Sequence, residues 1–147
     1  MGNPARGKSG GILVGVLLER FDVGSFDQGE FMLQLNLWDK FLKIKWNLLV
    51  IYGAAQDVNK LSFLSELSRF SAKNSEPLIV GGDFNIIRYI KEKNTMDGVH
   101  RYSQLFNSVI QFYELRELVM TGGLFTWSNN QENLIMEKLD RILVTRE

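Results

Sequence analysis

The sequence predicts a single domain of the mixed α/β class. Its 147 residues are 45% hydrophobic and 12% aromatic, enough to bury the core of one domain. Several apolar runs carry the period of β-strands, and two segments repeat apolar residues at the spacing of an α-helix. The strand patterns dominate the first third of the chain, and both helix patterns follow it.

The first third predicts three strands, at residues 11–18, 30–39 and 41–52. A polar, glycine-containing loop is expected between the first two, at about 19–29. The second strand has the clearest alternation, through Phe31, Leu33, Leu35 and Leu37. This order of strands is typical of an antiparallel meander.

Two amphipathic helices and three further strands are expected after the meander. The first helix should run from Val58 to about Lys73 with Asp57 as its N-cap, and it leads into a strand that begins at Pro77. The second helix should extend from about 102 to 118, before the stop signal at 121–123. Segments 124–128 and 135–144 then read as strands around a polar loop at 129–133.

The strand that starts at Pro77 ends in two glycines followed by Asp83 and Asn85. Residues two apart on extended backbone point to the same side, so a carboxylate and an amide should lie together at the end of a rigid strand. That pair suits phosphoryl chemistry, because the carboxylate can accept a proton from water while the amide donates to a phosphate oxygen. The alternative is an ordinary turn. A calcium loop is excluded, since Ile86 and Ile87 follow.

Composition excludes several classes of function. The 17 basic and 17 acidic residues cancel, so no overall field attracts nucleic acid or an anionic membrane. There is no cysteine, hence no disulfide, thiol nucleophile or thiolate metal site, and one histidine cannot form a histidine cluster. No apolar run approaches the roughly 20 residues of a membrane span, and the opening residues lack the apolar core of a signal peptide. We expect an intracellular protein that does not contact the membrane.

Two further segments have alternative interpretations. Residues 2–9 match a phosphate-binding P-loop literally, but no strand precedes them and no helix follows, so we expect residues 1–8 to be a flexible N-terminus. The charged residues Lys138, Asp140 and Arg141 lie in the last strand pattern. They either form a solvated face, or Asp140 points into a cleft while the neighbouring cations meet phosphate.

Five segments follow one another in a recognisable order: 9–13 (SGGIL), 49–53 (LVIYG), 81–85 (GGDFN), 125–128 (FTWS) and 138–143 (KLDRIL). Together they resemble the endonuclease/exonuclease/phosphatase superfamily, in particular the apurinic-type endonuclease domain of plant non-LTR (LINE-type) retrotransposons. The resemblance implies a four-layer α/β sandwich, in which two mainly antiparallel sheets pack face to face with helices outside. It also implies magnesium-dependent hydrolysis of a DNA phosphodiester, which nicks the target strand, and a location in the nucleus.

The resemblance assigns roles to four residues of this chain. Asp83 would orient or deprotonate the attacking water, Asn85 and Tyr52 would contact the phosphate, and Asp140 would orient a catalytic histidine. The family's metal-binding glutamate and its catalytic histidine have no counterpart here, and His100 lies between two motifs. Ala54 also stands where the family usually has proline after Tyr-Gly.

These departures predict that residues 9–147 are an internal fragment of the endonuclease domain, truncated at both ends and inactive as this chain. One alternative is a non-catalytic remnant that binds phosphate or nucleic acid. Another is a phosphatase of the same superfamily, which would share Asp83 and Asn85. Exposed sheet edges would favour self-association.

Overall fold

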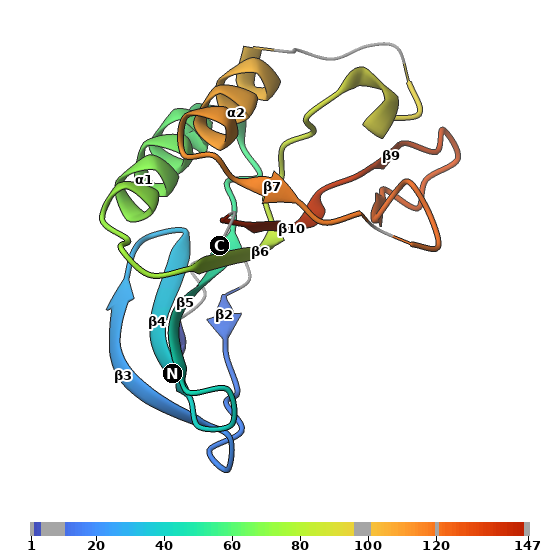
Figure 1. The fold of residues 1–147 in the computed structure, drawn as a ribbon. Helices are drawn as coiled ribbons and strands as arrows, with labels where there is room; N and C mark the ends of the chain where they lie inside the picture. Colours follow the sequence, from blue (N-terminus) through green and yellow to red (C-terminus); the bar gives the residue numbers. More distant parts are fainter. Residues whose placement is uncertain (1, 4–10, 96–100, 120, 146–147) are drawn as a thin grey trace.

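The computed structural model describes residues 2–3, 11–95, 101–119 and 121–145. The described residues form one six-stranded mixed sheet, two α-helices and two small two-stranded sheets (Figure 1). In spatial order, the large sheet consists of β3 (Phe21–Gln28), β4 (Met32–Asp39), β5 (Ile44–Tyr52), β6 (Leu78–Asp83), β10 (Asp140–Val144) and β7 (Arg116–Glu117). The mixed α/β class is therefore confirmed.

Strands β3, β4 and β5 form the antiparallel meander. The loop predicted at 19–29 is wrong, because β3 occupies most of it. Its side chains are largely exposed and its pairing with β4 shifts between Val23 and Phe26, so it lacks the alternation of a half-buried strand. The strand predicted at 11–18 is much shorter: only β2 (Ile12–Leu13) pairs, with β1 (Gly2–Asn3).

A helical crossover joins β5 to β6 and makes these two strands parallel. It contains a short 3₁₀ turn, η1 (Asp57–Asn59), and the helix α1 (Lys60–Ala72). The predicted N-cap at Asp57 is wrong, because the 3₁₀ turn begins there and Asn59 is the N-cap of α1. The parallel arrangement brings the carboxyl ends of β5 and β6 to one edge of the sheet, next to the start of α1.

The second half of the chain departs from the predicted boundaries. Helix α2 (Arg101–Phe112) ends before 118, since Glu114 adopts a left-handed backbone (φ 55°) and the chain turns into β7. The segment predicted as one strand at 135–144 divides into β9 (Met136–Glu137) and β10. Strand β9 pairs with β8 (Trp127–Ser128), the short form of the strand predicted at 124–128, whereas β10 joins the large sheet. The short turn η2 (Ile90–Glu92) lies between β6 and α2.

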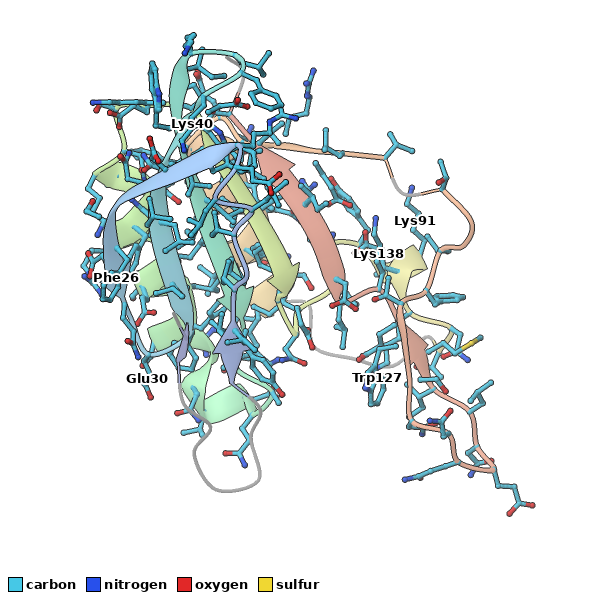
Figure 2. All side chains as sticks on the ribbon, turned by 90° about the horizontal axis from the view of Figure 1, so that it is seen from below. Phe26, Glu30, Lys40, Lys91, Trp127 and Lys138 are labelled. Carbon is cyan, nitrogen blue, oxygen red and sulfur yellow. The ribbon has the colours of Figure 1, made fainter. Side chains whose placement is uncertain are left out.

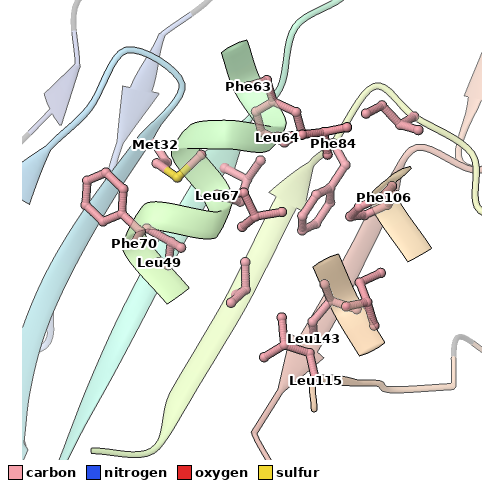
Figure 3. Packing of buried hydrophobic residues seen from close by; sticks show 14 of the residues in the cluster. Met32, Leu49, Phe63, Leu64, Leu67, Phe70, Phe84, Phe106, Leu115 and Leu143 are labelled. Atoms are coloured by element: carbon pink, nitrogen blue, oxygen red, sulfur yellow. The ribbon is translucent and has the colours of Figure 1, made fainter. Parts of the chain in front are cut away.

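The main core lies between the large sheet and the two helices, which cover the same face (Figure 1). Figure 3 shows α1 side chains packed on residues from the strands. The fully buried members include Phe63, Leu67 and Phe70 of α1, with Phe84 after β6 and Phe106 of α2. Within the described residues, no helix is long and apolar enough to cross a membrane.

The opposite, helix-free face of the sheet is covered unevenly. Leu33, Leu35 and Leu37 of β4 point to this face and are buried. Strand β2 contacts β5 on this side and brings in the buried Ile12 (Figure 1). Towards β10 the cover ends, and Ile142 is 46% exposed. The helix-free face therefore changes from buried to open across the sheet.

Candidate functional site

Tyr52, Asp83 and Asp140 lie side by side at one edge of the large sheet. Tyr52 ends β5 and is paired with Asp83, which ends β6. Asp83 is in turn paired with Asp140, which begins the antiparallel strand β10. Residues directly opposite each other on paired strands project to the same face. All three project from the helix-free face, since neighbouring Ile51 belongs to the helix-side core.

Asn85 joins this group two residues beyond the end of β6. Its side-chain Nδ2 donates a hydrogen bond to the Gly53 carbonyl oxygen at 2.8 Å, and its backbone N–H donates to Asp83 Oδ1 at 2.9 Å. Its φ of 54° lies in the left-handed region, which asparagine tolerates better than most residues. The structure thus brings to one edge of the sheet the four residues to which the resemblance assigns roles.

The contact from the Asn85 backbone to Asp83 is also the contact of an ordinary Asx turn. The turn and site interpretations are compatible here, because the turn hydrogen bond engages only Oδ1 of the carboxylate. Gly53 allows the close approach of the two loops: a Cβ at this position would overlap the carbonyl group of Phe84. The Gly53 N–H also donates to the Asp83 carbonyl oxygen at 2.6 Å.

Burial raises the pKa of the Asp83 carboxyl group, and the negative charge of Asp140 raises it further. The Asn85 N–H and the positive charge of Lys60 act in the opposite direction but do not cancel the rise. A carboxylate with a raised pKa holds a proton more readily at neutral pH, which makes it a better general base. Burial, assisted by the charge of Asp140, therefore gives Asp83 a property that favours proton abstraction.

Lys60 is a member of the site that the sequence analysis missed. Its side-chain ammonium is buried behind the two loops and donates to the carbonyl oxygens of Ala54, at 3.1 Å, and Asn85, at 2.5 Å. Burial lowers the pKa of Lys60, although Asp57, Glu137 and Asp83 favour its charged form. One signal was present in the sequence: a lysine in the first turn of a helix opposes the helix dipole, so it needs another partner.

The two cations next to Asp140 do not face the site. Arg141 is fully buried on the helix side, where it contacts Glu92 at 2.9 Å and Glu117 at 2.8 Å. Lys138 contacts Glu117 at 2.6 Å, and Arg88 contacts the same carboxylate at 3.0 Å. Neither proposed environment of these cations, a solvated face or a phosphate, is found. We call Arg88, Glu92, Glu117, Lys138 and Arg141 the buried ion network.

The network depresses the pKa of Glu117. Burial alone would raise this pKa, but a hydrogen bond from Lys138, the charge and one hydrogen bond of Arg141, and a hydrogen bond from Arg88 lower it from 4.5 to about 2. The guanidinium of Arg141 also lies 5.6 Å from the centre of the Phe106 ring. The network thus holds β10 against η2, β7 and α2, and it fixes the strand that carries Asp140.

The described residues do not offer a full set of metal ligands. Asp83 and Asp140 are two adjacent carboxylates, but no group of three or more acidic or histidine side chains converges in the described part of the chain. The described residues at this edge therefore supply at most two carboxylate ligands for a metal ion. His100 and most of the P-loop-like segment lie outside the described residues, apart from Gly2 and Asn3, which form β1.

The surface beside Asp140 is hollowed. A pocket of about 290 Å³ lies next to it and has a mainly apolar surface; besides Asp140, its lining residues are Gly82, Leu118, Val119, Thr126, Lys138, Arg141 and Ile142. Figure 2 shows Trp127, Lys91 and Lys138 on the side of the molecule from which the β8–β9 arm extends, away from Phe26 on β3. Trp127 is 42% exposed.

Comparisons with known proteins find similar folds but no close relative. A scan against protein-family models gives no match, and a search of curated proteins also gives none. Among solved structures, the endonuclease domain of TRAS1, a telomere-specific non-LTR retrotransposon, is 16% identical with a TM-score of 0.69. The match covers 86% of this chain and 56% of that domain.

Two other solved structures match with lower scores. The human Nocturnin catalytic domain with bound sulfate is 16% identical with a TM-score of 0.57, over 88% of this chain and 50% of that one. An endonuclease/exonuclease/phosphatase protein from Bacteroides vulgatus is 14% identical with a TM-score of 0.54, over 87% and 56%. The chain thus has a fold similar to that of this superfamily, and it spans about half the length of the solved chains it matches.

Proposed function

We propose that this chain carries the phosphodiester-binding side of a magnesium-dependent DNA endonuclease of the retrotransposon type, and that it does not cut DNA by itself. The observation that carries the proposal is the alignment of Tyr52, Asp83 and Asp140 across three adjacent strands, with Asn85 joined to the same edge. The fold is similar to that of nucleases and related enzymes, including a retrotransposon endonuclease. The whole protein would act on DNA in the nucleus.

Each of the four residues would have its own role in hydrolysis of the phosphodiester. Asp83 takes the proton from the attacking water, a role favoured by its raised pKa. Asn85 and Tyr52 contact phosphate oxygens, which gain charge in the transition state. Asp140 raises the pKa of Asp83 in this chain, and it would also orient a histidine where one is supplied. The solved Nocturnin domain contains a bound sulfate, an anion with the shape of a phosphate.

The four-layer sandwich belongs to the same proposal. Residues 9–147 would supply one large sheet with its two outer helices, and a second sheet would cover the helix-free face. Two observations support this arrangement: Ile142 is 46% exposed beside the site, and β2 already lies against β5 on that side. Left uncovered, this face and the sheet edges would favour self-association.

Lack of cutting follows from the incomplete ligand set. A metal ion normally neutralises the charge that develops on the phosphoryl group, and its protein ligands must be present to hold it. In the described residues only two carboxylates meet at the site. Removal of one preorganised electrostatic stabiliser commonly costs about 10²–10³ in rate, so loss of the metal site should abolish measurable turnover.

The first test incubates the purified chain with supercoiled plasmid and magnesium. We expect no nicked product. Magnesium-dependent nicking that disappears in Asp83→Ala would show that the site is complete, and it would overturn the proposal of an inactive chain. Hydrolysis of p-nitrophenyl phosphate without plasmid nicking would instead favour the phosphatase alternative.

The second test measures binding of a fluorescent DNA duplex at low salt. Asn85→Asp keeps a residue that tolerates the left-handed backbone but replaces the amide by a carboxylate, which repels phosphate. Gln104→Glu makes the same chemical change at an exposed site on α2, and it serves as the matched control. We expect Asn85→Asp to weaken binding by about tenfold or more, as for loss of a hydrogen bond to a charged group. Equal affinities for the two variants would contradict the site assignment.

A further inference from the structure

We propose that Lys60 is a positioning residue that clamps the loop carrying Asn85 onto the loop after Tyr52, and so holds Asn85 in the conformation that presents its amide at the phosphodiester site. The purpose of the clamp, to hold Asn85 ready for a phosphate, rests on the proposed function. The clamp itself is independent of that function and is tested separately.

The clamp consists of one ammonium between two backbone carbonyl groups. Lys60 Nζ donates to Ala54 O and to Asn85 O, which belong to the loops that follow β5 and β6. Two more bonds cross the same interface: Asn85 Nδ2 donates to Gly53 O, and Gly53 N donates to Asp83 O. The ammonium therefore closes the side of the interface that faces away from the open surface.

Contacts with neighbouring segments hold the backbone of Asn85. A left-handed backbone is uncommon for residues other than glycine, and it persists when surrounding contacts fix it. The carbonyl oxygen of Asn85 points to Lys60 in this conformation. Rotation of the backbone away from φ 54° would move this oxygen from the ammonium and the side-chain amide from Gly53. The two hydrogen bonds thus fix one orientation of the side chain.

The position of Lys60 is unfavourable for a lysine that has no such task. Its ammonium is buried, which penalises the charged form, and it lies at the positive end of the α1 dipole. Its nearest carboxylate oxygen, on the exposed Asp57, is 4.0 Å away. The backbone carbonyls are thus its close partners, and an apolar residue would avoid both penalties at the start of the helix.

The test compares Lys60→Met, Lys60→Arg and the control Lys45→Met by NMR of the isotope-labelled chain. Methionine keeps an apolar stem but cannot donate, arginine restores donors, and Lys45 is an exposed lysine on β5. The readout is the intraresidue NOE between the N–H and Hα of Asn85, which is strong only near a left-handed φ, together with the shift of the Asn85 side-chain amide.

We expect Lys60→Met to lose the strong NOE and to shift the side-chain amide, with arginine restoring both signals in part and Lys45→Met leaving them unchanged. Duplex affinity should fall about tenfold in Lys60→Met, as for loss of a charged hydrogen bond. If Lys60→Met keeps the wild-type signals of Asn85 in a folded chain, the clamp is refuted. Absence of DNA binding by the wild type would refute the proposed function alone, since the NMR readout needs no DNA.

A measurement on the wild type tests the clamp even if Lys60→Met does not fold. Hydrogen bonds to two carbonyl groups should slow exchange of the Lys60 ammonium protons, and they should give through-bond couplings from Nζ to the carbonyl carbons of Ala54 and Asn85. We expect these couplings for Lys60 and none for Lys45. A rapidly exchanging Lys60 ammonium with no such coupling would overturn the clamp.

Discussion

Replacing Arg141 by methionine removes the central cation of the buried ion network. The guanidinium contacts Glu92 Oε1 at 2.9 Å, Glu92 Oε2 at 3.3 Å and Glu117 Oε1 at 2.8 Å, and it also donates to the carbonyl oxygens of Ile86 and Lys138. Methionine keeps an unbranched apolar side chain but removes the guanidinium that lies 5.6 Å from the centre of the Phe106 ring. The change therefore tests the charge more than the packing.

The two glutamates are affected unequally. Glu117 keeps its contacts with Arg88 and Lys138. Glu92 keeps a hydrogen bond from the backbone N–H of Arg88, at 2.7 Å, but loses its contacts with the guanidinium. A buried charge left without its partner costs about 3–5 kcal/mol. Because Glu117 is still paired, we expect Arg141→Met to lower the unfolding free energy by about 3 kcal/mol, the lower end of this range.

Urea denaturation at pH 7 measures this loss. The control is Lys40→Met, which breaks an exposed ion pair with Asp22 and should cost at most about 1 kcal/mol. The double variant Arg141→Met with Glu92→Met removes both charges, and it should recover part of the stability. The reasoning is refuted if Arg141→Met costs no more than Lys40→Met, or if the double variant is less stable than the sum of its single changes.

Two other predictions concern stability. The pKa of Glu117 lies at about 2 in the folded chain and near 4.5 when unfolded. Its contribution is therefore complete above about pH 4.5 and is lost as the pH falls towards 2, so urea melts of Glu117→Gln should show a weaker dependence on pH in this window. Gly53→Ala should lose about 1–3 kcal/mol in a urea melt, because the new Cβ would overlap the Phe84 carbonyl. Gly15→Ala, where a Cβ meets open space, is the control, and an equal loss in both variants would argue against close packing of the loops.

The sequence predicted the elements whose own residues carry a strong period. Strand β4 and helix α1 were found in this way, since each buries one regular set of apolar side chains. Strand β3 was missed because most of its side chains are exposed, and its pairing depends on β4 rather than on an apolar stripe of its own. Its Gly24 and polar residues give the composition of a loop.

The candidate site was predictable where its residues end strands. Asp83 follows an obvious apolar run, and the resemblance to a known family placed Tyr52, Asn85 and Asp140 beside it. The partners that lie behind these residues were not predictable, because they are distant in sequence. Lys60 reaches Asn85 from the start of a helix, and Arg141 meets its glutamates only once β10 has joined the sheet.

The place of β10 between β6 and β7 has a consequence for biosynthesis. Strand β10 is the last strand in the described sequence, yet it fills an interior position of the sheet. While residues 140–144 are still inside the ribosome, the nascent chain must keep an open edge on β6, and Asp83 faces solvent without its neighbour. Pairings between distant segments also form slowly. The emerging chain is therefore most exposed to misassembly before β10 has paired with β6.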